Sequence, residues 1–254
     1  ARTGRSVEAN YDDLAGLKRI MASERPDYVL HVAGATKGRT YADFERGNVM
    51  PTENLLRAAE AEHKDLKRFV HVSSLAAYGP SRPGQPLRET DPRRPVEFYG
   101  ESKLASERVV ERAQVPYTII RPSGVYGPRD VDMLELFKLA RGRVNLFFGN
   151  RKSWGSFVYV DDVVSAILRA GAATAAEGRG YFLADGEPIT WETAFREIGQ
   201  RTRAIRERHG KHAVATFLGN PSAFSVAHAM FATAFFKGLG TRNAYGSSTQ
   251  DCSN

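Results

Sequence analysis

Short apolar runs that end in small or polar residues recur along the first half of the chain. They span residues 27–34, 66–74 and 116–124, and each has the length and composition of a buried strand in a parallel sheet. Between them, residues 48–62 and 96–112 carry apolar side chains at helical spacing. Strands that alternate with helices predict the α/β class, with a doubly wound parallel sheet.

The ends of the three predicted strands are suited to ligand contact. Gly34, Ser74 and Pro122 lie at the carboxyl ends, where the apolar runs stop. In doubly wound sheets, ligands bind beyond the carboxyl ends of the strands. We therefore expect one ligand site at this edge of the sheet.

Tyr99 and Lys103 lie four residues apart in the second predicted helix, so they share one helical face. A free phenol has a pKa near ~10, and a neighbouring ammonium favours the phenolate, so we expect the pair to exchange a proton near neutral pH. Ser74 would orient a substrate oxygen with its hydroxyl. The spacing alone is a weak signal, because a chain with 10 tyrosines also produces it by chance.

Several blocks of the sequence, in this order and spacing, resemble the extended short-chain dehydrogenase/reductases, also called the NAD-dependent epimerase/dehydratase family. The resemblance covers about residues 1–190 and implies a Rossmann-like fold. The blocks that carry it are residues 31–34, 48–49, 69–79, 99–103, 121–128 and 157–163.

The resemblance implies a role for each matching residue. Tyr99 would be the general acid/base, Ser74 would hydrogen-bond the reacting oxygen, and Lys103 would bind the nicotinamide ribose hydroxyls while lowering the Tyr99 pKa. The remaining predicted cofactor contacts are Ala33 and Gly34 against the cofactor, Asn48 as a brace, and the backbone from Pro122 to Val125 at the nicotinamide end. The cofactor would be NAD or NADP. Arg2 and Arg5 would favour the 2′-phosphate of NADP, unless they are ordinary solvated arginines.

The start of the chain departs from the family pattern. A dinucleotide fold opens with a strand and a Gly-rich turn, and neither is present before residue 27. We expect residues 1–5 to be the tail of a second strand, so that the chain is N-terminally truncated. The strands that end at Gly34 and Ser74 would then lose the central element that joins them. We expect the chain alone to fold poorly, to bind NAD(P)H poorly and to be inactive. Cooperative unfolding with micromolar NAD(P)H binding would contradict this.

The last quarter of the chain differs from the first part. Residues 187–254 resemble a fragment of a molybdopterin oxidoreductase catalytic subunit, and they predict a small α/β fragment with a helix that Thr190 caps. They lack that family's cysteine cluster, so no redox role transfers to them. We expect two domains, residues 1–186 and 187–254. The two resemblances meet near residues 186–192. Three explanations remain open for this join: a chimeric or misassembled sequence, a genuine fusion, or a diverged epimerase tail.

The resulting functional hypothesis is NAD(P)-dependent hydride transfer at a hydroxyl-bearing or carbonyl carbon. The substrate would be a small molecule, which is a nucleotide sugar for an epimerase and a 3-hydroxysteroid or carbonyl compound for a reductase. Leu75 follows Ser74 where dehydratases of the family usually place an acidic residue, which disfavours dehydration. A non-catalytic dinucleotide-binding protein is the alternative of another class.

Composition limits the partners. The net charge is +7, but the basic residues are scattered, which indicates a solvated surface and no nucleic-acid partner. Cys252 is the only cysteine, so internal disulfides and cysteine metal clusters are excluded, and we expect no metal. No membrane span is expected. We expect a cytoplasmic location. The full-length protein from which this chain would derive is compatible with a homodimer.

His31 and His71 lie within predicted strands, and we expect them to be core histidines.

Overall fold

A computed structural model describes residues 4–82, 85–128, 130, 152–210, 213, 216–218 and 244–246. The chain divides into two compact units, each described by itself below. The first consists of Ala1–Gly127 with Ser156–Gly186, and the second of Pro128–Gly155 with Glu187–Asn254.

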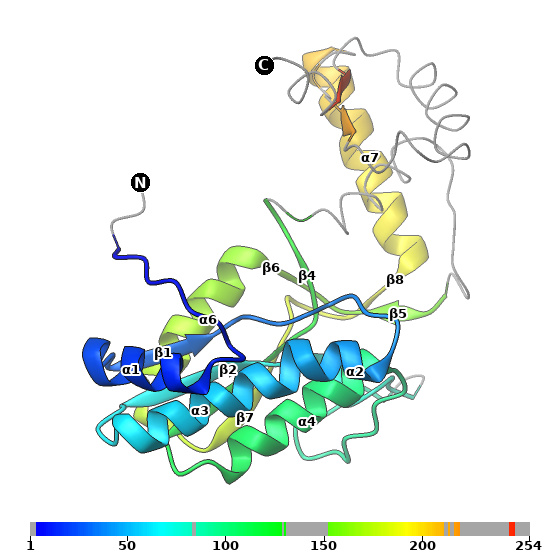
Figure 1. Ribbon diagram of the computed structural model, residues 1–254. Coiled ribbons are helices and arrows are strands. Elements are labelled where there is room, and N and C mark those ends of the chain that lie inside the picture. The colour runs from blue at the N-terminus through cyan, green and yellow to red at the C-terminus, as the bar shows by residue number, and fades with distance from the viewer. Residues whose placement is uncertain are drawn as a thin grey trace. The chain divides into compact units, whose positions relative to one another are not determined.

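The first unit contains a four-stranded sheet in which every described pair of neighbours is parallel. Its strand order is β1-β2-β3-β7, which is also the order along the chain (Figure 1). The bounds of these strands are β1 (Tyr28–His31), β2 (Arg68–Val72), β3 (Tyr117–Pro122) and β7 (Arg179–Leu183). Each lies within an apolar run of the sequence, because a strand covered on both faces needs apolar side chains on both.

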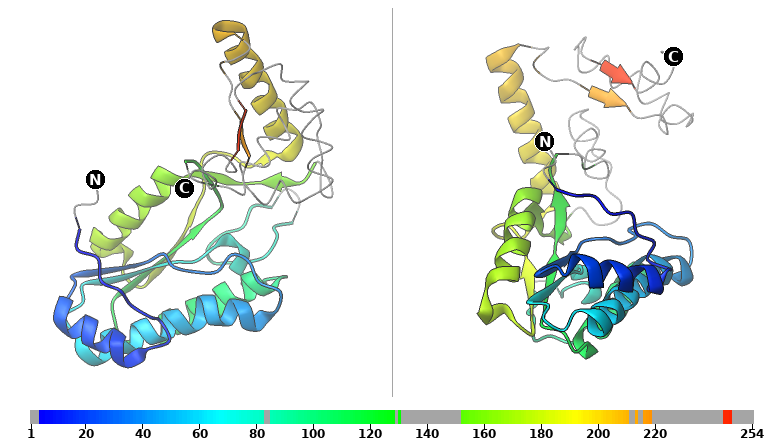
Figure 2. Two further views of the ribbon diagram at one scale, coloured as in Figure 1. Left: turned by 45° about the horizontal axis from the view of Figure 1, so that its top comes forward. Right: turned by 60° about the vertical axis from the view of Figure 1, so that its left-hand side comes forward.

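Helices cover both faces of this sheet, as Figure 2 shows. Helices α1 (Leu14–Glu24), α3 (Met50–Glu62) and α4 (Phe98–Arg112) pack on the face that carries Phe69 and Ile119. Helix α6 (Val160–Ala172) packs on the other face. The core on this face joins Val163 and Ile167 of α6 to side chains of the strands, Val70, Ile120 and Val158. These layers confirm the predicted α/β fold with a parallel sheet.

The pairing of β1 with β2 corrects one prediction. We expected the strands that end at Gly34 and Ser74 to lose the element that joins them, but they are direct neighbours, in register from Tyr28↔Arg68 to His31↔His71. The prediction was wrong because an apolar run does not encode which other run it pairs with. Gly4 and Arg5 lie in no strand, against the expected strand tail, and residues 1–3 lie outside the described part. Arg5 Nη1 lies 3.3 Å from Glu24 Oε1.

Shorter elements connect these layers. Helix α2 (Tyr41–Phe44) runs into a π-helical turn, η1 (Glu45–Val49), and then into α3, where Pro51 occupies the first turn. A 3₁₀ turn, η2 (Leu75–Ala77), follows β2. Strand β4 (Gly124–Tyr126) pairs in parallel with β6 (Phe157–Tyr159), and η3 (Thr174–Ala176) precedes β7.

The second unit holds a long helix. Helix α7 (Trp191–His209) begins after Thr190, whose side chain accepts a hydrogen bond from the backbone of Thr193 at 3.1 Å, and it ends before Gly210. The predicted helix and its cap are therefore confirmed. β5 (Trp154–Gly155) pairs antiparallel with β8 (Ile189–Thr190), and β9 (Thr216–Leu218) pairs in parallel with β10 (Ala244–Gly246). Residues 219–243 of the predicted α/β fragment lie outside the described residues.

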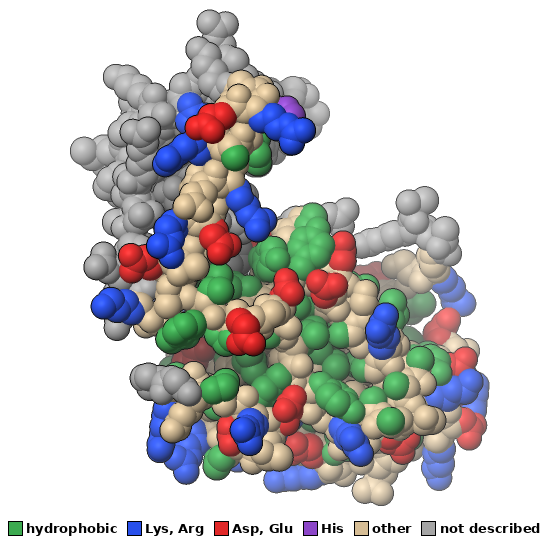
Figure 3. All heavy atoms as spheres, turned by 180° about the vertical axis from the view of Figure 1, so that it is seen from behind, with side chains coloured by type: hydrophobic (Ala, Val, Ile, Leu, Met, Phe, Trp, Pro, Cys, Tyr) green, Lys and Arg blue, Asp and Glu red, His purple; other side chains and the backbone are tan. Residues whose placement is uncertain are grey.

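Large apolar side chains are exposed on the α6 side of the first unit. Figure 3 views the molecule from behind and shows hydrophobic side chains lying between charged ones. Tyr28 and Leu30 of β1 are 44% and 40% exposed, and Leu168 of α6 is 57% exposed. Among the described residues, β1 pairs with β2 alone. None of the helices in the described part of the chain is long and apolar enough to cross a membrane.

Candidate active site

Ser74 and Tyr99 meet at the carboxyl end of β2. Ser74 is the N-cap of η2, where its Oγ accepts from the backbone of Ala76 at 3.2 Å. Tyr99 lies in the first turn of α4 and is partly buried. Ser74 lies near enough to Tyr99 to act on the pKa of its phenol. The structure therefore brings together the hydroxyl and the phenol that the sequence singled out.

Gly100 allows α4 to approach η2 this closely. A Cβ at Gly100 would lie 2.4 Å from the carbonyl oxygen of Ala76 and 3.1 Å from Pro95 Cβ. A real side chain does not fit there without moving η2, which carries Ser74. Glycine at this position therefore sets the distance between Ser74 and Tyr99.

We expect Gly100→Ala to destabilise the protein by about 1–3 kcal/mol, because the added methyl group overpacks this contact. Helix propensity alone would predict the opposite sign, since alanine favours a helix over glycine by about 1 kcal/mol. Urea unfolding measures the effect. Gly171→Ala in α6 is the matched control, because its Cβ meets no atom closer than 3.6 Å and should be neutral or stabilising. Equal effects of the two changes would contradict the steric argument.

Lys103 lies one turn further along α4, and its side chain is buried. Its Nζ donates to the carbonyl oxygen of Val72 at 2.7 Å. A Cβ at Gly34 would lie 3.7 Å from this Nζ and 2.8 Å from Asn48 Oδ1. Gly34, Asn48 and Lys103 therefore meet at the end of β1, where the glycine avoids a clash with the Asn48 amide.

The electrostatics of the pair correct another expectation. Lys103 was expected to lower the Tyr99 pKa, but burial raises that pKa above its usual value of 10, with the Ser74 hydrogen bond acting in the lowering direction and Glu97 in the raising one. The ammonium of Lys103 is directed at the Val72 carbonyl, and the cost of burying a phenolate dominates. Burial also lowers the Lys103 pKa to about 8, although Glu107 acts against it.

Stability should therefore depend on pH through Lys103. In the unfolded chain its pKa is near 10.5, so between pH 8 and 10.5 the unfolded state binds more protons than the native state, and stability rises with pH. We expect the wild type to gain about 2 kcal/mol relative to Lys103→Met between pH ~7.5 and ~9.5. Urea unfolding of both proteins at the two pH values measures this. A difference between them that stays constant with pH would contradict the shift.

Asn48 connects the loop after β1 to α4. It is buried in the π-helical turn η1, a distortion that is frequent at functional sites. Its Oδ1 accepts from Ala35 N at 2.8 Å, and its Nδ2 donates to Ala35 O at 3.1 Å and to Ser102 Oγ at 2.8 Å. Ser102 Oγ in turn donates to the carbonyl oxygen of Tyr99 at 2.7 Å. A side-chain amide therefore links two of the segments predicted to contact a cofactor.

The other predicted cofactor contacts lie at neighbouring strand ends. Ala33 is exposed after β1, Pro122 is buried at the end of β3, and Val125 is 37% exposed in β4. Ser123 Oγ, between the last two, is buried and has no hydrogen-bond partner among the described residues. This unpaired hydroxyl is a feature that a bound dinucleotide could complete. No cluster of His, Cys, Asp and Glu suited to a metal occurs in the described part of the chain.

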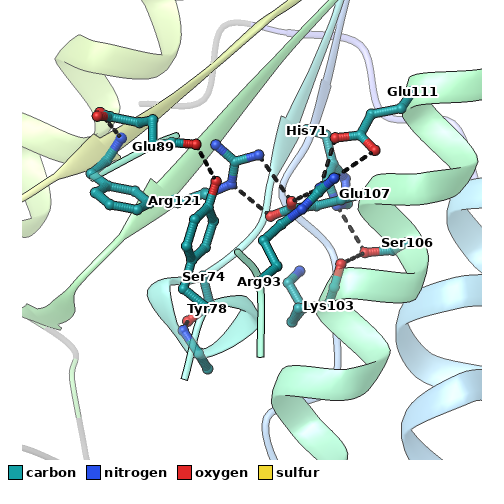
Figure 4. A network of polar contacts seen from close by, with 12 residues as sticks. His71, Ser74, Tyr78, Glu89, Arg93, Lys103, Ser106, Glu107, Glu111 and Arg121 are labelled. Carbon is teal, nitrogen blue, oxygen red and sulfur yellow. Dashed lines mark hydrogen bonds and ion pairs between the residues drawn. The ribbon is translucent and has the colours of Figure 1, made fainter. Parts of the chain in front are cut away.

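Behind the site lies an ion network that the sequence did not indicate (Figure 4). Glu107 is fully buried, and Arg121 Nε and Nη2 donate to its two carboxylate oxygens at 2.9 Å each. Arg93 Nη1 adds a third contact to Glu107 at 2.8 Å and pairs with Glu111 at 2.7 Å. The only sequence signal was the spacing of Glu107, four residues after Lys103 on the same face of α4. The network joins α4, β3 and the loop that precedes Tyr99.

The same loop is held at a second point. The carbonyl oxygen of Glu89 accepts from the Tyr78 hydroxyl at 2.8 Å, and its carboxylate accepts from Phe182 N at 3.0 Å (Figure 4). The Arg121 guanidinium lies over the Tyr78 ring, 5.2 Å from its centroid. Glu89 of this loop is therefore attached both to Tyr78, which follows η2, and to β7.

The parallel sheet with helices on both faces, and polar side chains at the carboxyl ends of its strands, places this protein among the Rossmann-like dinucleotide-binding folds. The chain belongs to the NAD dependent epimerase/dehydratase family, whose family profile matches residues 1–183. A UDP-glucose 4-epimerase from Mycolicibacterium smegmatis is 30% identical over 207 residues, which are 76% of this chain and 64% of that protein. A ceramide reductase from Caulobacter vibrioides is 34% identical over 139 residues, or 55% of this chain and 38% of that protein.

Solved structures agree with this assignment. The UDP-glucose 4-epimerase of Thermotoga maritima with UDP-glucose gives a TM-score of 0.69 at 26% identity, covering 80% of this chain and 70% of that one. The Bordetella bronchiseptica enzyme WbmG, in complex with NAD and UDP, gives 0.65 at 25% identity, covering 78% and 63%. The chain spans from 38% to 64% of the length of the two curated relatives named above.

Proposed function

We propose that the protein transfers hydride between NAD or NADP and a hydroxyl-bearing or carbonyl carbon, with Tyr99 as the general acid/base. The observation that carries this proposal is the meeting of Ser74 and Tyr99 at the carboxyl end of a parallel strand, with Lys103 buried one turn further along the helix of Tyr99. The family assignment and its NAD-bound structural relatives support the choice of cofactor.

The described residues include a donor for the proton that the substrate oxygen receives in this reaction. NAD(P)H, when bound, supplies the hydride. In the reductive direction, the Tyr99 phenol gives its proton to the substrate oxygen, and Ser74 donates a hydrogen bond to the same oxygen. The raised Tyr99 pKa keeps the phenol protonated at neutral pH, which suits a proton donor. Gly34, Asn48 and Lys103 would hold the cofactor, with Ala33, Pro122 and Val125 lining its path.

Two reaction types fit this chemistry, and each has a supporting observation. The ceramide reductase relative favours net reduction. The epimerase relatives favour a nucleotide sugar as substrate, because the Thermotoga maritima structure holds UDP-glucose. Leu75 next to Ser74 disfavours dehydration. A non-catalytic dinucleotide-binding protein and an inactive fragment are the remaining alternatives.

The two reactions differ in what happens to the cofactor. We would incubate the intact natural protein that contains this chain with NADPH or NADH and a panel of carbonyl compounds, and separately with UDP-sugars. A reductase consumes reduced cofactor in equal amount to the alcohol formed. An epimerase interconverts two sugar epimers by proton NMR with no net change in cofactor. Cofactor binding without either activity would support the non-catalytic alternative.

We also propose that residues 187–254 are a segment of different origin, with a sequence join between residues 186 and 192. The family match that stops at residue 183 supports this. Amplification across codons ~170–220 of the source DNA tests it. One continuous product would contradict a misassembled sequence.

A further inference from the structure

Two buried histidines lie side by side behind the candidate site. His31 of β1 and His71 of β2 are register partners, and their rings stack with centroids 5.6 Å apart. Their exposed fractions are 2% and 1%. Neither side chain belongs to the acid/base group proposed above. A buried imidazole needs partners that replace water, and the partners of these two rings indicate what they do.

The His71 ring holds the backbone of Lys103 through one hydroxyl (Figure 4). His71 Nε2 lies 3.0 Å from Ser106 Oγ, and Ser106 Oγ donates to the Lys103 carbonyl oxygen at 2.8 Å. A serine hydroxyl has one hydrogen, so its oxygen must accept from His71 Nε2–H. The next residue of β2, Val72, accepts from Lys103 Nζ at 2.7 Å. Consecutive residues of β2 therefore hold both ends of Lys103.

The His31 ring makes the same arrangement with Asn48. His31 Nε2 lies 3.0 Å from Thr52 Oγ1, which donates to the Asn48 carbonyl oxygen at 2.7 Å. The threonine hydrogen is again used, so His31 donates through Nε2–H. The Asn48 side chain continues to Ser102 Oγ, and Ser102 reaches the Tyr99 carbonyl. The two histidines thus begin two hydrogen-bond chains, one ending at Lys103 and the other at Tyr99.

Both chains require neutral rings with the proton on Nε2. Lys103 of α4 acts on both rings, His31 and Arg121 of β3 act on His71, and the Tyr11 ring packs edge-on against His31. Burial and then these cations lower the His31 pKa to about 4 and the His71 pKa well below 6.5. His71 is a core histidine, as the sequence predicted. Only one of its ring nitrogens has a hydrogen-bond partner, because Nδ1 is buried without a partner among the described residues.

We propose that His31 and His71 are positioning residues, which act as neutral Nε2–H donors and fix the backbone of Asn48 and Lys103 relative to Tyr99. The inference rests on the proposed function in one respect, the assignment of Tyr99 and Lys103 to the chemistry. A small displacement of either group would lower turnover, because proton transfer requires near-contact geometry.

The protonation state is tested without any turnover. Long-range ¹H–¹⁵N NMR of the intact protein with ¹⁵N-labelled histidine distinguishes the two neutral tautomers from the cation, and His31→Gln and His71→Gln assign the two rings. We expect both rings to be Nε2–H tautomers between pH ~8 and ~5.5. An Nδ1–H tautomer, or a ring that titrates near pH ~6.5, would overturn the proposal.

The positioning role is tested by pairs of variants. His71→Phe keeps a stacked ring but has no donor, whereas the amide nitrogen of His71→Gln can replace Nε2. We expect His71→Phe to lower kcat at least tenfold with KM and the cofactor Kd changed less than threefold, and His71→Gln to restore kcat to within threefold of wild type. Ser106→Ala, a smaller change, should reproduce the loss if His71→Phe does not fold. His63→Gln is the control, because His63 is a buried histidine bonded to the Pro26 carbonyl.

The outcomes separate the two proposals. Equal losses in His71→Phe and His71→Gln, or a loss of cofactor affinity in place of kcat, would overturn the positioning role. If the intact protein turns over no substrate, the proposed function fails. The NMR result then decides by itself whether the histidines act as neutral donors.

Discussion

Tyr99→Phe is expected to lower turnover by about 10²–10⁴-fold while leaving cofactor binding unchanged. The change removes the phenol hydroxyl, on which Ser74 acts, and leaves the ring, whose centroid lies 6.0 Å from that of the Phe44 ring. Folding should therefore survive, and only the proton donor is lost. Turnover is measured in the intact natural protein with the substrate identified above, and the cofactor Kd by the fluorescence of NADH or NADPH.

A second tyrosine provides the control for this experiment. Tyr117 begins β3, at the end of the sheet opposite to the candidate site, and its ring packs against the core. Tyr117→Phe should leave kcat within about twofold of wild type. Unchanged turnover in Tyr99→Phe would remove Tyr99 from the mechanism. A loss of cofactor binding in that variant would instead assign the tyrosine a binding role.

Glu107→Gln is expected to destabilise the fold by about 3–5 kcal/mol, the usual cost of removing one partner from a buried ion pair. Glu107 is fully buried between Arg121, which is 4% exposed, and Arg93. The neutral amide would leave the Arg121 guanidinium inside the protein without its counter-charge. This loss is a large share of the 5–15 kcal/mol typical of whole domains, so urea unfolding should register it clearly.

Glu111→Gln is the matched control for Glu107→Gln. Glu111 lies one turn further along α4, pairs with Arg93 alone among the described residues, and has a side chain that is 31% exposed. Water screens this pair, so its loss should cost less than about 1 kcal/mol. If the two variants were equally stable, the buried network would contribute no more than a surface ion pair, and the argument for Glu107 would fail.

The strands and most of the helices could be predicted because the apolar residues that they bury follow a regular spacing within each segment. The runs that became β1, β2 and β3 are apolar on both faces, and the Thr190 cap is a side-chain property of one residue. The pairing of β1 with β2 could not be predicted, since it depends on neighbours about 40 residues apart that share no complementary motif. Helix α1 was missed, although Leu17 and Met21 have helical spacing.

The candidate site could be predicted only as a set of residues. The meeting of Ser74 with Tyr99 follows from the strand ends, but the orientation of Lys103 toward the Val72 carbonyl depends on burial, which no spacing encodes. The arginines that hold Glu107 were missed for the same reason. Arg93 and Arg121 lie 14 residues on either side of it, and charged residues are normally assigned to the surface.

The order β1-β2-β3-β7 bears on how the molecule forms during its synthesis. Each strand leaves the ribosome after the neighbour on which it docks, and no described strand of this sheet has to enter between two others. The helices α3 and α4 form in the intervals and cover the growing face. A ribosome adds about 5–20 residues per second, so β1, β2 and β3 can assemble one by one as they emerge, well before residue 254 is joined.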